Sequence, residues 1–132
     1  MNQENSVVEK GSQYRLIPKK DVLEYKNQGV VESIESRLGK KPEDAEMLFA
    51  DVLKFLSLLN NSVRLWLSPE IKKGLEIFIL HTGDYYDFNL KYFDRFIEYS
   101  PERGFSGGQR MDVEQTTRLV WEVYPMLSVN WK

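Results

Sequence analysis

Apolar side chains recur at spacings of three and four residues along most of the chain, which is the period of an α-helix buried on one face. The clearest such stretch lies between Lys41 and Asn60, with apolar residues at Met47, Leu48, Val52, Phe55, Leu56 and Leu59. A looser stretch follows Asp21, a suitable capping residue. Gly29 weakens this stretch and Gly39 ends it, which predicts one broken helix or two short ones.

Ser68-Pro69 predicts the start of a third helix, because serine caps helices and proline is tolerated in their first turn. The apolar pattern continues to about Thr82, and Gly83-Asp84 predicts a break with Asp84 as the next N-cap. The helix that follows is densely aromatic, so we expect it in the middle of the core. Pro101 is predicted to end it.

A last helix is predicted from Asp112 to Pro125, after a glycine-rich loop over residues 104–109 that suits neither helix nor strand. No stretch shows the alternation of a strand. The chain is therefore predicted to be an all-α, compact single-domain bundle of about five helices. Residues 1–19 are predicted to be an extended or partly disordered arm, residues 20–125 the helical domain, and residues 126–132 a tail.

Composition narrows the possible functions. The 132 residues suit one domain, and the absence of cysteine excludes disulfides, thiolate nucleophiles and thiolate metal sites. The net charge of −2 comes from interspersed acids and bases, so we expect no nucleic-acid partner. Neither a signal peptide nor an apolar run of about 20 residues is present. We therefore expect a soluble cytoplasmic protein with no membrane partner.

The residues also resemble a family, the helical domain of glycine-rich domain-containing proteins and related small bacterial proteins of unknown function. The matching positions occur in the family's order over roughly residues 22–125: Phe55-Leu56, Ser68-Pro69, Ile79-Leu80, Thr82, Tyr85, Phe88, Phe93, Phe96-Ile97, Pro101 and Leu119 to Tyr124. The resemblance implies a helical architecture and no defined activity.

Two departures from this family fall on its histidines. Where the family has Trp-His, this chain has Leu75-Glu76, and where the family has paired His, this chain has Glu98-Tyr99. The resemblance implies that any polar or metal site built on those histidines is absent here or rebuilt. A rebuilt site would use Glu76, His81 and Glu98.

His81 is the only histidine, and its side chain is suited to a general base or a ligand. A structural role for a single histidine is the simpler interpretation. Asp84 and Asp87 suggest a carboxylate pair, but capping and first-turn positions explain both. The loop over residues 104–109 superficially suggests a phosphate cradle. Because it lacks the P-loop lysine and a preceding strand, a mobile connection is the preferred interpretation.

The tyrosines and phenylalanines between residues 85 and 99, with nearby cations, permit base stacking or core packing. Their helical spacing favours the core and leaves Tyr86 as the expected exposed aromatic. Trp66 and Trp131 either fill gaps or, in the tail, offer Trp131 as a contact residue for a partner.

The missing catalytic groups predict a non-catalytic module that binds or regulates a protein partner, contacted by the arm, the glycine loop and the tail. The competing hypothesis is an enzyme or ligand-binding protein with a pocket around Glu76, His81, Tyr85 and Glu98. We expect no cofactor, no metal and no catalytic residue. The expected binding residues are Glu76, His81, Tyr85, Tyr86, Glu98 and Trp131, and the sequence predicts no particular oligomeric state.

Overall fold

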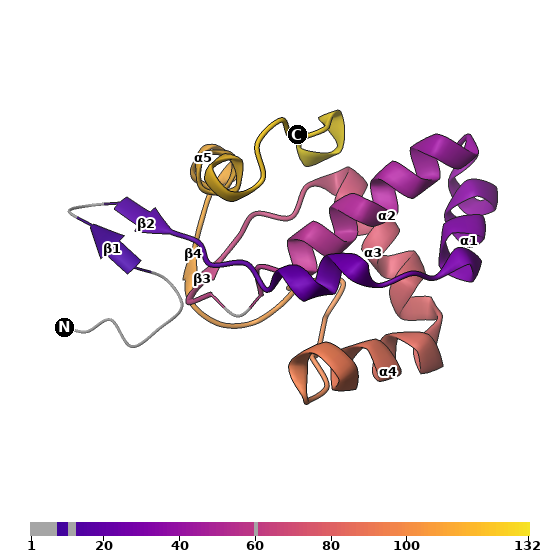
Figure 1. The fold of residues 1–132 in the computed structure, drawn as a ribbon. Coiled ribbons are helices and arrows are strands. Elements are labelled where there is room, and N and C mark those ends of the chain that lie inside the picture. Colours follow the sequence, from indigo (N-terminus) through magenta and orange to yellow (C-terminus); the bar gives the residue numbers. More distant parts are fainter. Residues whose placement is uncertain (1–7, 11–12, 60) are drawn as a thin grey trace.

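A computed structural model of the chain describes residues 8–10, 13–59 and 61–132. The α-helices in these residues are α1 (Gln28–Leu38), α2 (Pro42–Leu56), α3 (Pro69–Leu80), α4 (Thr82–Phe93) and α5 (Val113–Val123) (Figure 1). Two 3-10 helices and four short strands complete the order: η1 (Lys20–Glu24), η2 (Val129–Trp131), β1 (Val8–Lys10), β2 (Gln13–Arg15), β3 (Val63–Arg64) and β4 (Gln109–Arg110). The predicted mostly helical fold of about five helices is confirmed.

Three predicted helix ends are confirmed by their capping geometry. The Ser68 side chain accepts a hydrogen bond from the Ile71 backbone N–H at 3.2 Å, which caps α3 ahead of its proline. Asp112 and Gln115 form a reciprocal capping box at the start of α5, with bonds of 2.8 and 2.9 Å. Gly39, at a φ of 64°, ends α1 in the left-handed conformation that glycine adopts without strain.

Both ends of the aromatic helix differ from the prediction. α3 already ends at His81, whose backbone leaves the helical region, and α4 begins directly after it. Asp84 is therefore not the N-cap but lies in the first turn of α4, where a carboxylate still faces free N–H groups. The helix ends at Phe93 instead of Pro101, because Asp94 adopts a left-handed φ of 62°.

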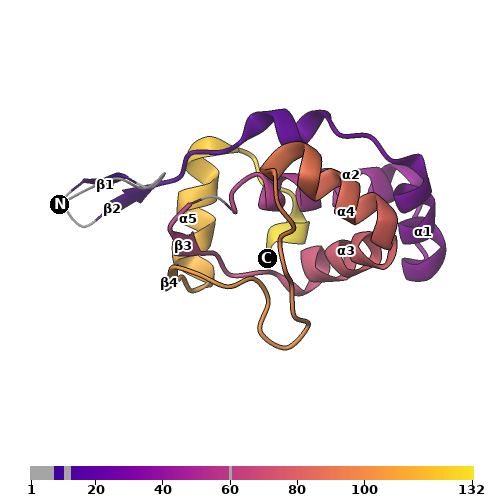
Figure 2. The same ribbon diagram turned by 90° about the horizontal axis from the view of Figure 1, so that it is seen from below.

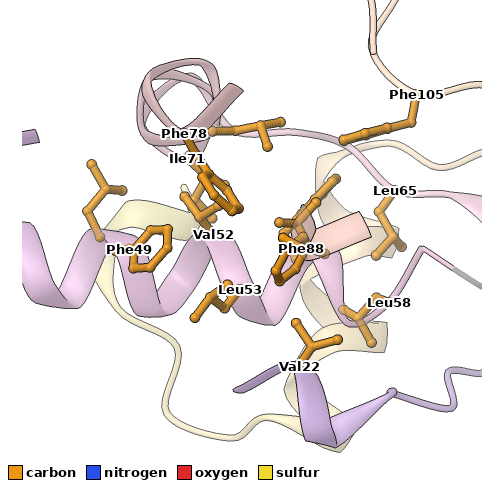
Figure 3. Packing of buried hydrophobic residues seen from close by; sticks show 14 of the residues in the cluster. Val22, Phe49, Val52, Leu53, Leu58, Leu65, Ile71, Phe78, Phe88 and Phe105 are labelled. Atoms are coloured by element: carbon orange, nitrogen blue, oxygen red, sulfur yellow. The ribbon is translucent and has the colours of Figure 1, made fainter. Parts of the chain in front are cut away.

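The core lies around α2, and a cluster of aromatic rings fills the space between α2, α3 and α4. Figure 3 shows these rings, with Phe78 of α3 near both Phe49 of α2 and Phe88 of α4. The ring centroids of Phe78 lie 5.3 Å from those of Phe49 and 5.2 Å from those of Phe88. Edge-on packing of this kind adds to the burial of apolar area. The expectation that the aromatic helix packs into the core is met by Phe88, whereas Phe96 lies beyond the helix end and is 47% exposed.

The N-terminal strands β1 and β2 pair antiparallel and project from the helical body (Figures 1 and 2). The residues that follow are held against that body. Leu16 is 1% exposed, and the Ile17 backbone exchanges two hydrogen bonds with the Asn61 side chain, at 2.9 and 3.1 Å. The predicted arm thus contributes its last residues to the fold, and residues 1–7 and 11–12 of it lie outside the described residues.

The C-terminal tail is bound to α2 through one buried carboxylate, that of Asp51, which is 2% exposed. It accepts hydrogen bonds from the side chains of Ser128 at 2.6 Å, Asn130 at 2.9 Å and Trp131 at 3.0 Å. Trp131 is itself 3% exposed. Of the two roles predicted for Trp131, the structure therefore shows the filling of a gap, with the indole in the interface between tail and helix.

Candidate functional site

A cavity of about 620 Å³ lies beside β3 and β4, at the end of the helical body away from α1 (Figure 1). Its lining includes residues 61–67 from the segment around β3 and, from the segment between α4 and β4, Tyr99 and residues 101–108. Phe55 and Leu58 contribute apolar surface from α2 and its end. A volume of this size suits a small organic ligand.

The pairing of two very short strands forms one edge of this cleft. β3 and β4 run parallel, with Val63 opposite Gln109 and Arg64 opposite Arg110. Gly108 permits the approach, since a Cβ at this residue would lie 2.7 Å from the carbonyl carbon of Ser62. The glycine loop, interpreted from sequence as a mobile connection, therefore includes one position where only glycine fits the fold.

Cationic side chains converge on the cleft, although the chain as a whole carries a net charge of −2. The cationic lining residues are Arg64, Lys72, Arg95, Arg103 and Arg110, whereas the only acidic lining residue is Glu102. Among the described residues, none of the five forms an ion pair with a carboxylate. A cleft whose walls have a low dielectric constant focuses the electrostatic field of the charges that line it. Because most of these charges are positive, the cleft attracts anions.

Arg64 has the most unusual environment of these cations. Its Nε is buried and has no hydrogen-bond partner among the residues that the structure describes. Its partner in the strand register is a second arginine, Arg110. Residues directly opposite each other on paired strands point to the same face, and like charges in that position repel. Two arginines thus occupy partnered strand positions, and neither forms an ion pair with a carboxylate among the described residues.

Aromatic rings supply the apolar part of the cleft. The Phe105 ring centroid lies 5.0 Å from that of Tyr99 and 6.1 Å from that of Phe55. All three side chains line the cavity, and Trp66 adds a partly buried indole on the opposite wall.

The residues predicted to form a pocket are not brought together around this cavity. None of Glu76, His81, Tyr85 and Glu98 lines it. Tyr85 is 2% exposed, and its hydroxyl donates to the Ile97 carbonyl at 3.2 Å. Burial raises the pKa of Tyr85 to about 12. Glu98 is exposed on the irregular segment after α4.

The predicted exposed aromatic, Tyr86, is confirmed as such. It is 49% exposed on α4, with its ring 6.1 Å from that of the half-exposed Phe96.

His81 lies between a serine and an aspartate at the junction of α3 and α4. Its Nε2 is 2.8 Å from the Ser33 hydroxyl of α1, and its Nδ1 is 3.8 Å from an Asp84 carboxylate oxygen. The order serine, histidine, aspartate resembles a catalytic triad, but the distance between His81 and Asp84 is too long for a hydrogen bond. Asp84 instead accepts a hydrogen bond from the Asn27 amide at 3.1 Å. The arrangement fastens α1 to the α3–α4 junction and gives no support to catalysis.

The side chains of Glu76 and Tyr99 contact each other. The Tyr99 hydroxyl donates to the Glu76 carboxylate at 2.8 Å. Burial and the neighbouring carboxylate raise the pKa of Tyr99 well above its ordinary range. Tyr99 lines the cleft, so this pair connects the predicted site residue Glu76 to the cavity.

Sequence analysis missed Arg64, Arg110 and Asp51. Asp51 could have been found, because it interrupts the apolar stripe of α2 three residues after Leu48. The sequence around Arg64 and Arg110 contains no such signal. Either residue could be an ordinary surface arginine, and only the pairing of β3 with β4 shows that the two are neighbours.

Within the described ranges, no cluster of three or more histidine, aspartate or glutamate side chains could hold a metal ion. No helix found there has the length and apolar character needed to cross a membrane. Comparisons with protein-family models, with curated proteins and with solved structures found no match to this chain. The resemblance described above therefore stays a prediction.

Proposed function

We propose that the chain is a non-catalytic binding module whose site is the arginine-lined cleft, and that its ligand carries an anionic group. The observation that carries the proposal is that Arg64 and Arg110 line the cleft at partnered strand positions, with no ion pair to a carboxylate among the described residues. A pair of like charges in this position costs stability. An anion bound in the cleft would offset that cost.

The residues around the cleft support binding over catalysis. General acid–base work needs a group whose pKa lies near the operating pH. Glu102 is the only carboxylate among the described lining residues, and burial raises the pKa of the lining Tyr99 hydroxyl away from neutrality. Arginine remains charged at all ordinary pH values and serves to hold an anion, not to exchange protons.

The protein partner expected from sequence remains the second candidate. The cleft also favours a protein partner. An anionic side chain of another protein could bind the arginines through the same kind of anionic group that a small molecule would carry. The glycine loop, which was expected to contact a partner, forms part of the cleft wall.

Calorimetric titration and thermal shift test the proposal with one panel of anions, namely phosphate, sulfate, benzoate and phenyl phosphate, at constant ionic strength. A ligand that binds only the folded state raises the melting temperature. We expect at least one anion to bind with 1:1 stoichiometry, and the Arg110→Met variant to lose that binding.

Arg37→Met is the matched control, because Arg37 lies on α1, far from the cleft, and its removal changes the net charge equally (Figure 1). Equal loss of binding in both variants would show a general charge effect. No binding of any anion to the wild-type protein would refute the proposal.

A further inference from the structure

We infer that the anionic group is a phosphoryl group carried on an aromatic body, so that the ligand is an aryl phosphate monoester. This inference rests on the proposed function. Arg64 and Arg110, which form no ion pair among the described residues, indicate the phosphoryl group. The aromatic side chains that line the same cleft indicate the aromatic body.

The number and spacing of the arginines favour a phosphoryl group over a carboxylate. Neighbouring strands lie about 4.8 Å apart, so the backbone places Arg64 and Arg110 side by side, and both side chains line the cleft. One carboxylate is satisfied by one fork. A phosphate monoester offers three oxygens and a charge of about −2, which matches two arginines in geometry and charge.

The other cations of the cleft leave room for this charge. Lys72 is already engaged, because its Nζ donates to the Pro101 carbonyl at 2.9 Å. Arg95 and Arg103 belong to the irregular segment after α4, and both are exposed. They therefore add long-range attraction, whereas the paired positions of Arg64 and Arg110 on β3 and β4 define where the anion is held.

The cleft is too large for a bare anion. Its volume of about 620 Å³ suits a small organic molecule, and a phosphate ion alone would leave most of it filled with water. Phe55 and Phe105 are 3% and 7% exposed, so their rings form a floor and not a free surface. With Trp66 and Tyr99 also lining the cavity, a planar aromatic group would find ring faces and edges to pack against.

The test uses a ligand series on the unchanged full-length protein, so that it does not depend on whether a variant folds. The probes are inorganic phosphate, methyl phosphate, phenyl phosphate and benzoate, titrated by calorimetry at one ionic strength. We expect phenyl phosphate to bind at least about ten-fold more tightly than each of the other three, since it alone provides both parts.

The outcomes separate the inference from the proposed function. Benzoate binding as tightly as phenyl phosphate would overturn the phosphoryl assignment and leave an anion site in place. Methyl phosphate binding as tightly as phenyl phosphate would overturn the aromatic body. If no probe binds, the proposed function itself fails.

Two variants and one peptide complete the experiment. Arg110→Met should weaken phenyl phosphate at least about ten-fold, whereas Arg37→Met should leave it unchanged. A short phosphotyrosine peptide carries the same aryl phosphate on a protein chain. Tighter binding of the peptide than of phenyl phosphate indicates a protein source of the group, and weaker binding indicates a small molecule. Either result supports the aryl phosphate, and loss of phenyl phosphate binding in Arg37→Met alone would overturn its placement.

Discussion

Replacing Arg64 by methionine should stabilise the free protein while removing its ligand site. The buried Nε of Arg64 has no hydrogen-bond partner, and its register neighbour Arg110 carries the same charge. Methionine keeps an unbranched apolar side chain in the same space but brings no buried N–H. The substitution therefore removes two unfavourable features of the unliganded fold and keeps most of the packing.

The size of the effect follows from the buried N–H. A buried donor without an acceptor costs about 1–3 kcal/mol, and some of that gain is lost because methionine does not reproduce the arginine contacts. We expect a net increase of about 1 kcal/mol in the free energy of unfolding. For a chain of 132 residues this corresponds to a rise of about 4 °C in melting temperature.

Thermal and urea unfolding of the wild type, Arg64→Met and Arg37→Met provide the measurement. The Arg37 variant should change by less than about 0.5 kcal/mol, as expected for an exposed site. Repeating the comparison at high salt should reduce the part of the gain that comes from repulsion between the arginines. A clear loss of stability in Arg64→Met would show that the guanidinium is satisfied within the free protein, and the reasoning for an anion site would fail.

Other parts of the structure give three further predictions. Asp51→Ala should lower the free energy of unfolding by about 3 kcal/mol in urea titrations, because three donors of the tail lose their acceptor; an unchanged midpoint would contradict the docked tail. Gly108→Ala should cost about 1–3 kcal/mol, since the added methyl overlaps the backbone leading into β3, whereas Gly83→Ala meets nothing within 4 Å and should cost no stability. Burial raises the pKa of Tyr85 to about 12 and the pKa of Tyr99 further, so stability that is fully present below about pH 10 should fall as the pH rises toward 12; a flat urea midpoint over that range would refute it.

Local signals were sufficient to predict the helices. The Ser68-Pro69 start of α3 and the Asp112 cap of α5 each depend on atoms within a few residues, so the sequence contains the whole interaction. The end of α4 was less predictable. Proline is a strong stop signal, but the helix ends earlier, at Phe93, because Asp94 adopts a left-handed conformation that aspartate tolerates.

The cleft was beyond prediction because it depends on contacts between distant residues. Arg64 and Arg110 meet only through two strands of two residues each, which are too short to show an alternating pattern. The tail was misjudged for a related reason. A tryptophan near the end of a chain is expected to be exposed unless a buried hydrogen-bond acceptor for its indole N–H is known. Here that acceptor is Asp51, which is 80 residues away in the sequence.

The pair of Glu76 and Tyr99 shows how the cleft keeps its positive charge. Glu76 lies close enough to the cleft to bond a residue of its wall, but it does not line the cavity itself. The Tyr99 hydroxyl donates to the Glu76 carboxylate, and burial together with that carboxylate raises the pKa of Tyr99, which strengthens its hold on the proton. Glu76 keeps its negative charge but forms no ion pair with a cationic lining residue among the described residues. The arginines of the cleft therefore remain available to an anion.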